Sequence, residues 1–149
     1  AFNGCSGLTS VTIPDSVTSI GERAFAGCSA LTRITVNNKN TVYHSQDNCL
    51  IDTQNKILVL GCKASTIPTD GSVTSIGAYA FYDCGGLTSI TIPNNVTSIG
   101  YAAFCACNGL TSITFNGTKE QWNAIEKGEG WNKSTGDYTI HCSDGDIAK

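Results

Sequence analysis

Apolar residues recur in this chain with the two-residue spacing of β-strands, in short segments that are similar to one another. Four segments follow the pattern Leu-x-x-Ile-x-Ile or a close variant, and they begin at Leu8, Leu31, Leu87 and Leu110. The last two apolar residues of each segment are two positions apart, as expected of a strand with one buried face. Pro14 and Pro93 follow two of these segments and end them. The pattern therefore predicts one short strand in each copy.

These strands belong to a longer repeat with a period of 23 residues. The motif Ala-Phe-x-x-Cys begins at residues 1, 24, 80 and 103, and a second extended segment, Val-Thr-Ser-Ile-Gly, begins at residues 17, 73 and 96. A unit of this length cannot enclose its own apolar side chains, so successive copies must stack and bury them between neighbours. The predicted structural positions of the Ala-Phe-x-x-Cys motif are Phe2, Phe25, Phe81, Phe104, Cys5, Cys28, Cys84 and Cys107.

Two local conformations follow from the same repeat. Gly21, Gly77 and Gly100 stand where the chain leaves the second extended segment, and we expect a positive φ there, which costs other residues more than glycine. The Ala-Phe-x-x-Cys run is too short for a free-standing helix. We therefore expect a single turn of α or 3₁₀ helix, held in place by its buried Phe.

The full repeat resembles the BspA-like leucine-rich repeat family, with the pattern Leu-x-x-Ile-x-Ile-Pro-x-x-Val-x-x-Ile-Gly-x-x-Ala-Phe-x-x-Cys over residues 1 to 116. This resemblance implies an α/β repeat solenoid, curved and right-handed, with a parallel β-sheet on its concave face and short helical or 3₁₀ turns on its convex face. It also implies cell-surface or secreted proteins of host-associated microbes that act in adhesion and protein binding. The family's motif contains no catalytic residues.

The repeat is irregular at residues 47–79, inside a predicted solenoid that covers residues 1–117. Asn40 and Tyr43 replace the Val and Ile of the second segment in the copy before it. The apolar runs 49–52 and 57–60, separated by four polar residues, are typical of a β-hairpin. Two interpretations remain open: an irregular repeat that keeps the solenoid continuous, or a lip beside the sheet that forms part of a binding site.

Residues 118–149 lack the repeat and are predicted to form a helix-plus-strand cap of the same domain. Thr118 and Gln121 have the spacing of a capping box, and Trp122 follows on the helix. The strand-like run 138–142 then continues the cap, which would protect the apolar end of the stack. The alternative for the aromatic residues Trp122 and Trp131 is a carbohydrate site. The short segment 144–146 is expected to be a solvated tail.

The eight cysteines do not indicate a disulfide framework, because four of them occupy one repeat-equivalent position beside a buried Phe. We expect those four thiols to be reduced and structural. Cys49 with Cys62, across the predicted hairpin, is the best disulfide candidate. A zinc site from Cys105, Cys107 and the pair His141–Cys142 lacks two tight ligand pairs, so no metal or cofactor is predicted. No histidine accompanies an activated nucleophile, and no catalysis is predicted.

Composition and charge narrow the classes of partner. The chain has 149 residues, 40% of them hydrophobic and 14% charged, with a net charge of −3. This charge provides no cationic field for nucleic acid. No apolar run approaches the ~18 residues of a membrane-spanning helix, so membrane insertion is not predicted. The absence of Met and the opening within a motif suggest a piece of a longer protein.

The candidate ligand-binding residues lie between the apolar positions of the strands. Thr12, Thr35, Thr91 and Thr114 should face away from the core and line up across one sheet. Thr is also simply a good β-former on an exposed strand. The functional interpretation is a hydroxyl-rich concave floor with one charge, Arg33. The residues beside the threonines are Ser10, Arg33, Ser89 and Ser112.

The sequence thus predicts a cell-surface or extracellular module for protein or glycan binding and adhesion, whose partner is a host or microbial surface protein or glycan. This step rests on the family resemblance, because no site chemistry carries it. The alternatives are a structural spacer and a substrate-recruiting arm of a larger surface protein or enzyme.

Overall fold

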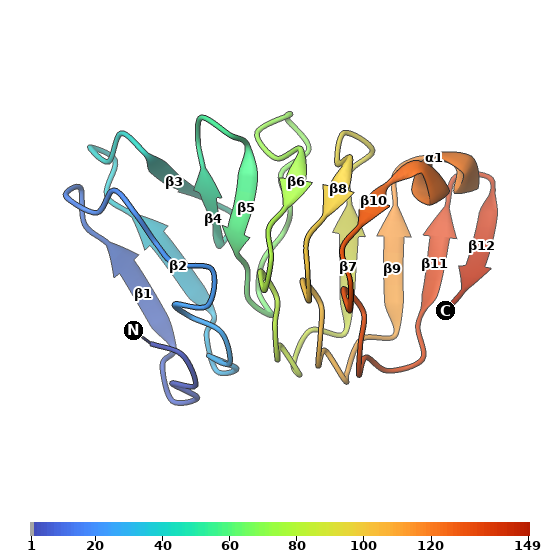
Figure 1. Cartoon of the computed structure of the whole chain (residues 1–149), viewed down its shortest axis with the longest axis horizontal. Helices are drawn as coiled ribbons and strands as arrows, with labels where there is room; N and C mark the ends of the chain where they lie inside the picture. The colour runs from blue at the N-terminus through green and yellow to red at the C-terminus, as the bar shows by residue number, and fades with distance from the viewer. Residues whose placement is uncertain (1) are drawn as a thin grey trace.

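In the computed structural model, which describes residues 2–149, each Leu-x-x-Ile-x-Ile segment forms a strand, as predicted. The four strands are β1 (Ser10–Ile13), β2 (Arg33–Val36), β7 (Ser89–Ile92) and β9 (Ser112–Phe115). Their alternation places one set of side chains in the core and the other at the surface, as in β7, where Ile90 and Ile92 are buried and Ser89 and Thr91 are exposed. Neighbouring copies pair in parallel with like residues opposite, for example Thr91 with Thr114. The chain is therefore a β-solenoid (Figure 1).

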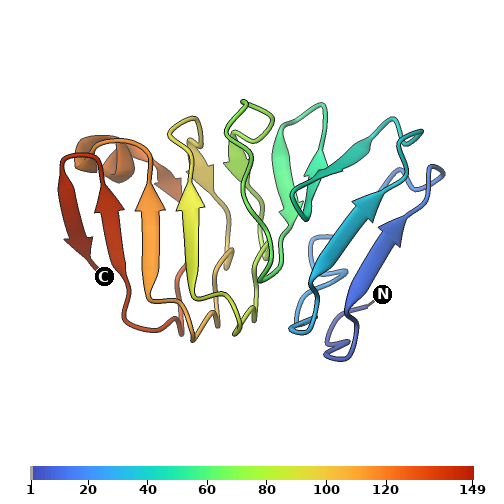
Figure 2. The ribbon, with the colours of Figure 1, turned by 180° about the vertical axis from the view of Figure 1, so that it is seen from behind.

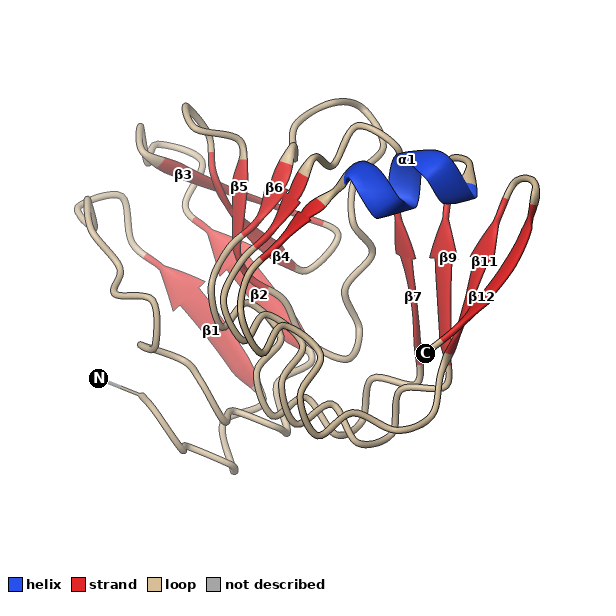
Figure 3. Cartoon of the chain, turned by 45° about the vertical axis from the view of Figure 1, so that its right-hand side comes forward, coloured by secondary structure: helices blue, strands red, loops and turns tan. Residues whose placement is uncertain are grey.

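The second extended segments that begin at Val73 and Val96 also form strands, and they belong to a separate sheet on the opposite side of the core (Figure 3). The strands β6 (Ser75–Ile76), β8 (Ser98–Ile99) and β10 (Glu126–Lys127) pair in parallel in this sheet. We call this side the short-strand face. The side that carries β1, β2, β7 and β9 is the long-strand face, seen from the front in Figure 2.

The irregular segment forms the predicted hairpin and one strand that the sequence analysis missed. The strands β3 (Tyr43–Gln46), β4 (Cys49–Asp52) and β5 (Ile57–Leu60) pair antiparallel in succession, and β5 then pairs in parallel with β6. The hairpin thus extends the short-strand sheet, which has the order β10-β8-β6-β5-β4-β3.

This hairpin is a wall inside the molecule rather than a lip beside the sheet. Leu50 and Leu60 contribute to the core beneath β1 and β2, whereas Ile51 and Leu58 contribute to the core of the later coils. Both faces are therefore covered. The wall also interrupts the long-strand face, because β2 pairs with β1, whereas β7 pairs with β9 in a separate sheet.

Asn40 and Tyr43, which replace the Val and Ile of the second segment, join neighbouring coils through their side chains. The Asn40 side chain donates to the carbonyls of Pro14 and Val17, both at 2.9 Å, and its Oδ1 accepts from the next backbone amides. The Tyr43 hydroxyl accepts from the Ile20 amide at 3.0 Å. Side chains thus make the contacts between coils that backbone ladders make between β6 and β8.

The Ala-Phe-x-x-Cys runs are single hydrogen-bonded turns with the i→i−3 spacing of a 3₁₀ turn, and they do not continue into a helix. Alternate amides close turns within a coil, such as Tyr82 N to Tyr79 O at 3.1 Å. The amides between them donate to the next coil, such as Phe81 N to Ala103 O at 2.7 Å. A helix would direct all of these amides inward, whereas stacking uses every second one to join the coils.

The repeat glycines also differ from the prediction, because positive φ falls elsewhere. Gly4, Gly27, Asp83 and Ala106, which are repeat-equivalent, have φ between 57° and 79°. Gly100 is instead required by close packing: a Cβ there would lie 2.6 Å from the Ala78 nitrogen.

The C-terminal segment contains one more coil, although the sequence repeat does not return. The helix α1 (Lys119–Ala124) begins with the predicted capping box of Thr118 and Gln121. The strand β11 (Thr139–Cys142) then pairs in parallel with β9, and β12 (Gly145–Ala148) pairs antiparallel with β11 and ends the sheet. The expected solvated tail is therefore part of a hairpin. Trp122 is 3% exposed, so its ring is closed to a sugar.

The aromatic residues of the repeat form stacked pairs in the core. Phe81 and Phe104 stack with ring centroids 5.0 Å apart, and Trp131 covers Phe104 edge-on at 6.2 Å. Phe2 and Phe25 stack in the same way at 5.3 Å, but Phe2 is 46% exposed. Burial of the Phe position is thus confirmed in three copies and not in the first.

The cysteines of the repeat position are free thiols, and two of them bond to the preceding coil. Cys107 Sγ donates to the carbonyl of Phe81 at 3.0 Å, and Cys28 Sγ to that of Phe2 at 3.2 Å. Burial raises the pKa of Cys84 and of Cys107 to about 12. The disulfide candidate is wrong, because Cys49 and Cys62 are both free thiols that belong to different cores.

Candidate functional site

The predicted binding residues lie on two separate patches of the long-strand face, not on one continuous floor. The reason is the hairpin wall, which takes the place of a strand between β2 and β7. We call the residues on β1 and β2 the N-terminal patch: Ser10, Thr12, Arg33 and Thr35. We call the residues on β7, β9, β11 and β12 the C-terminal patch: Ser89, Thr91, Ser112, Thr114, Thr139, His141 and Asp146.

The N-terminal patch is small and fully exposed. Thr12 and Thr35 face each other across the strand pair, with their hydroxyl oxygens 3.1 Å apart. Thr35 Oγ1 also donates to the Val11 carbonyl at 3.4 Å. Arg33 lies opposite Ser10 in the register and supplies the only charge of this patch. With two strands, the patch offers a narrow surface.

The C-terminal patch is a wider surface on four paired strands. One row across it reads Thr91, Thr114, His141 and Asp146, and each member lies opposite the next in the strand register. His141 Nδ1 and Asp146 Oδ1 are 2.9 Å apart, and the two side chains are 46% and 61% exposed. A parallel row contains Ser89, Ser112 and Thr139. Hydroxyl groups and one imidazole–carboxylate pair therefore stand side by side on a rigid sheet.

His141 and Asp146 were not among the predicted binding residues. The signal for His141 was present in the run Tyr-Thr-Ile-His-Cys, whose alternation places His on the same face as Thr. Asp146 carries no comparable signal, because its place depends on β12 folding back onto β11. Its neighbour Asp144 accepts the Lys119 amide at 2.8 Å, which ties this turn to α1.

The chemistry of both patches is hydrogen bonding by neutral groups, supplemented by single charges. Across residues 2–149, no group of three or more His, Cys, Asp or Glu side chains is arranged to hold a metal ion. No helix described in this range is long and apolar enough to cross a membrane.

A cavity of about 780 Å³ meets the two patches only at Thr12 of the N-terminal patch. It opens at the end of the solenoid beside β1 and is lined by core positions of the first copy, among them Val11, Val17 and Phe25. These are the residues that a neighbouring coil covers elsewhere in the stack. The cavity is therefore a consequence of repeat geometry.

Comparison with solved structures shows the same fold. A leucine-rich repeat protein from Eubacterium ventriosum is 28% identical, with a TM-score of 0.51, and the match covers 72% of this chain and 36% of that one. A leucine rich cell surface protein from Faecalibacterium prausnitzii is 23% identical, with a TM-score of 0.56 and coverage of 80% and 51%. The pneumococcal vaccine antigen PcpA is 15% identical, with a TM-score of 0.58 and coverage of 91% and 45%.

This chain thus spans between about a third and a half of those proteins. No curated protein sequence matches it. The family described as BspA type leucine rich repeat region matches residues 1–120 in six copies, two more than the sequence pattern alone makes evident. The parallel strands and the stacked rings of Phe81 and Phe104 agree with this match. The chain therefore belongs to the BspA-type leucine-rich repeat family.

Proposed function

We propose that this chain is a binding module of a bacterial cell-surface or secreted protein, and that it attaches to a protein or glycan through the C-terminal patch. The observation that carries the proposal is the row of Thr91, Thr114, His141 and Asp146 across four paired strands. The surface role is supported by the similar fold of a solved protein described as a leucine rich cell surface protein.

A rigid sheet suits this role because its side chains are already in place before a ligand arrives. Preorganised groups lose little conformational freedom on binding, so more of the interaction energy appears as affinity. The hydroxyl groups of Thr and Ser both donate and accept hydrogen bonds, as the hydroxyls of a glycan and the backbone of a protein do. The N-terminal patch has the same chemistry on half as many strands.

The experiment is a screen of immobilised glycans and purified host surface proteins, followed by two matched variants. Thr91→Glu places a charged, larger side chain in the C-terminal patch, and Thr12→Glu makes the same change in the N-terminal patch. We expect Thr91→Glu to weaken binding at least tenfold, since an interface rejects an unpaired charge, and Thr12→Glu to leave it unchanged. Both variants should keep the parent's unfolding midpoint.

The opposite result, with loss of binding in Thr12→Glu alone, would move the site to the N-terminal patch. Absence of binding to every immobilised probe would favour the structural spacer, the alternative that needs no ligand.

A further inference from the structure

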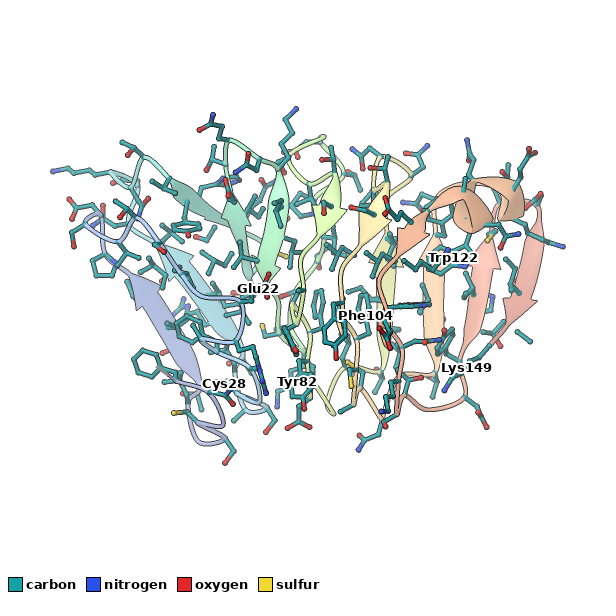
Figure 4. The ribbon with its side chains drawn as sticks, in the orientation of Figure 1. Glu22, Cys28, Tyr82, Phe104, Trp122 and Lys149 are labelled. Carbon is teal, nitrogen blue, oxygen red and sulfur yellow. The ribbon has the colours of Figure 1, made fainter. Side chains whose placement is uncertain are left out.

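Three tyrosines gather on the short-strand face, on the side of the core away from both patches. Tyr79, Tyr82 and Tyr101 lie on the turn ladders that continue from β6 and β8, and Figure 4 shows Tyr82 in the lower half of this face. Arg23 and Lys133 border them. We call these five residues the tyrosine cluster.

The rings of the tyrosine cluster hold one another in fixed orientations. Tyr79 meets Tyr82 and Tyr101 edge-to-face, each with ring centroids 5.5 Å apart and interplanar angles of 66° and 64°. The Arg23 guanidinium carbon lies 5.0 Å above the centre of the Tyr79 ring. Arg23 belongs to the second copy, before the hairpin wall, and Tyr79 follows the wall. The cluster therefore bridges the two parts of the solenoid.

The fold itself does not require tyrosine at these places. In the other copies, Arg23 and Ala102 stand where Tyr79 stands, and Ala26 and Cys105 stand where Tyr82 stands. Glu22 and Ala78 take the place of Tyr101, which is 50% exposed. Because charged and small residues serve equally well in the same turns, packing alone does not explain three adjacent aromatic rings.

The charges around the rings point to an anion. The cluster surrounds a depression of about 190 Å³ lined by Tyr79, Tyr82, Tyr101, Arg23 and Lys133, together with Ala102, Cys105 and Gly130. Both charged residues of this lining are cations. In the part of the chain that the structure describes, neither forms an ion pair with a carboxylate. Glu22, Asp83 and Glu129 adjoin Arg23, Tyr82 and Gly130 in the chain, but none of the three carboxylates is part of the lining.

The backbone of the depression disfavours an extended peptide as its occupant. Its amides are already used between coils: Tyr79 N donates to Tyr101 O at 3.0 Å, and Ala106 N to Lys133 O at 2.8 Å. A bound peptide strand needs a free sheet edge with unpaired amides. A sugar ring needs none, because its C–H face stacks on an aromatic ring and its hydroxyls and carboxylate bond to side chains.

We propose that the tyrosine cluster is a second binding site, which takes a single acidic sugar residue of a glycan by stacking it on Tyr101 and pairing its carboxylate with Arg23 and Lys133. The site is independent of the C-terminal patch, since it lies on the opposite face and shares no residue with it. A module with two such faces can hold two surfaces at once.

The test uses the full chain and calorimetric titration with three soluble probes. They are a tetrasaccharide of alternating glucuronic acid and N-acetylglucosamine, the neutral N-acetylglucosamine tetrasaccharide, and a short poly-glutamate peptide. We expect only the acidic tetrasaccharide to bind. Arg23→Gln should weaken its binding about tenfold, the loss expected when a charge-assisted hydrogen bond is removed. Tyr101→Ala should do the same, and Tyr101→Phe should retain the stacking.

The control is Lys39→Gln, which removes one exposed positive charge outside both patches and outside the tyrosine cluster and should bind the probe as the parent does. Equal affinity for the neutral tetrasaccharide would overturn the pairing with a carboxylate, and tighter binding of poly-glutamate would overturn the choice of a sugar. Absence of binding by the acidic tetrasaccharide would overturn the proposal whatever the result for the C-terminal patch. Unchanged unfolding midpoints would show that Arg23→Gln and Tyr101→Ala leave the fold intact.

Discussion

The parts of the solenoid on either side of the hairpin wall contain the same motif but bury it to different degrees. Phe2 and Phe25 stack with an interplanar angle of 3°, and Phe81 and Phe104 stack with an angle of 4°. The second pair is 1% and 0% exposed, whereas the first pair is 46% and 7% exposed. The motif thus specifies the contact between neighbouring copies. The degree of burial differs between the two parts and is not specified by the motif.

The same contrast holds for the connection between coils. After the wall, β6, β8 and β10 join the coils through backbone pairing. Before the wall, residues 17–21 form no strand, and the side chains of Asn40 and Tyr43 join them to the next copy instead. Backbone ladders tolerate substitution at the surface, whereas a side-chain bridge depends on one residue. The N-terminal copies should therefore be the more sensitive to single changes in the second segment.

The largest test of this comparison is removal of the repeat Phe on each side of the wall. Phe81→Ala should lower the free energy of unfolding by about 3 to 5 kcal/mol, because a fully buried ring leaves a cavity. Phe2→Ala should lower it by less than about 1 kcal/mol, since nearly half of that ring is already in water. Urea denaturation of both variants measures the difference. Equal losses would mean that the two parts do not differ in packing.

A second test uses the repeat glycines, which are equivalent in sequence but not in surroundings. A Cβ at Gly100 would lie 2.6 Å from the Ala78 nitrogen, whereas a Cβ at Gly21 would meet nothing within 4 Å. Gly100→Ala should therefore cost about 1 to 3 kcal/mol through overpacking. Gly21→Ala should be neutral or stabilise by up to about 1 kcal/mol, because it restricts the unfolded chain. Thermal unfolding of the two variants measures the difference. Destabilisation by Gly21→Ala would contradict the expectation that there is room for a Cβ at Gly21.

The smallest effect concerns the thiols, and it appears as a dependence on pH. Burial raises the pKa of Cys107 from 9.0 to about 12, so between these values the unfolded chain loses a proton that the folded chain keeps. The stability contributed by the neutral thiol is complete below pH 9 and is lost as the pH rises towards 12. The loss is about 1.4 kcal/mol per pH unit for this thiol.

The free energy of unfolding should fall less between pH 9 and pH 10 in Cys107→Ala than in the parent, because the variant lacks this thiol. Urea denaturation at both pH values measures the difference. The double variant Cys84→Ala with Cys107→Ala should reduce the fall by about twice as much, because burial raises the pKa of Cys84 equally. Cys28→Ala in the N-terminal copies should reduce it less, since that thiol is only half-buried. Identical slopes in parent and variants would show that these thiols ionise in the folded chain as readily as in the unfolded one.

Much of the fold could be predicted from the sequence, and the exceptions have a common cause. The four strands, the hairpin and the capping box all depend on residues near one another in the chain, so local pattern reveals them. Thr35 and Thr91 align only if β2 and β7, which are 56 residues apart in the chain, become neighbours. They do not, because the hairpin wall takes the place of a strand between them. His141 lies in the C-terminal patch because β11 pairs with β9, and Asp146 joins it only through the fold-back of β12 onto β11.

The tyrosine cluster shows the same limit for a candidate site. Each tyrosine stands at a variable position of its own copy, so no motif marks it. The repeat period places Tyr79 and Arg23 in equivalent turns, but only the structure brings them together across the irregular segment.

The sequence by itself determined the unit of this protein, a 23-residue coil with one apolar strand, one Phe and one thiol facing its neighbour, because those contacts are fixed by short-range spacing. Only the tertiary structure decided that the long-strand face carries two separate patches. An irregular segment with two apolar faces must be covered on both, and by inserting between the coils it divides the long-strand face into two patches and brings Arg23 onto Tyr79.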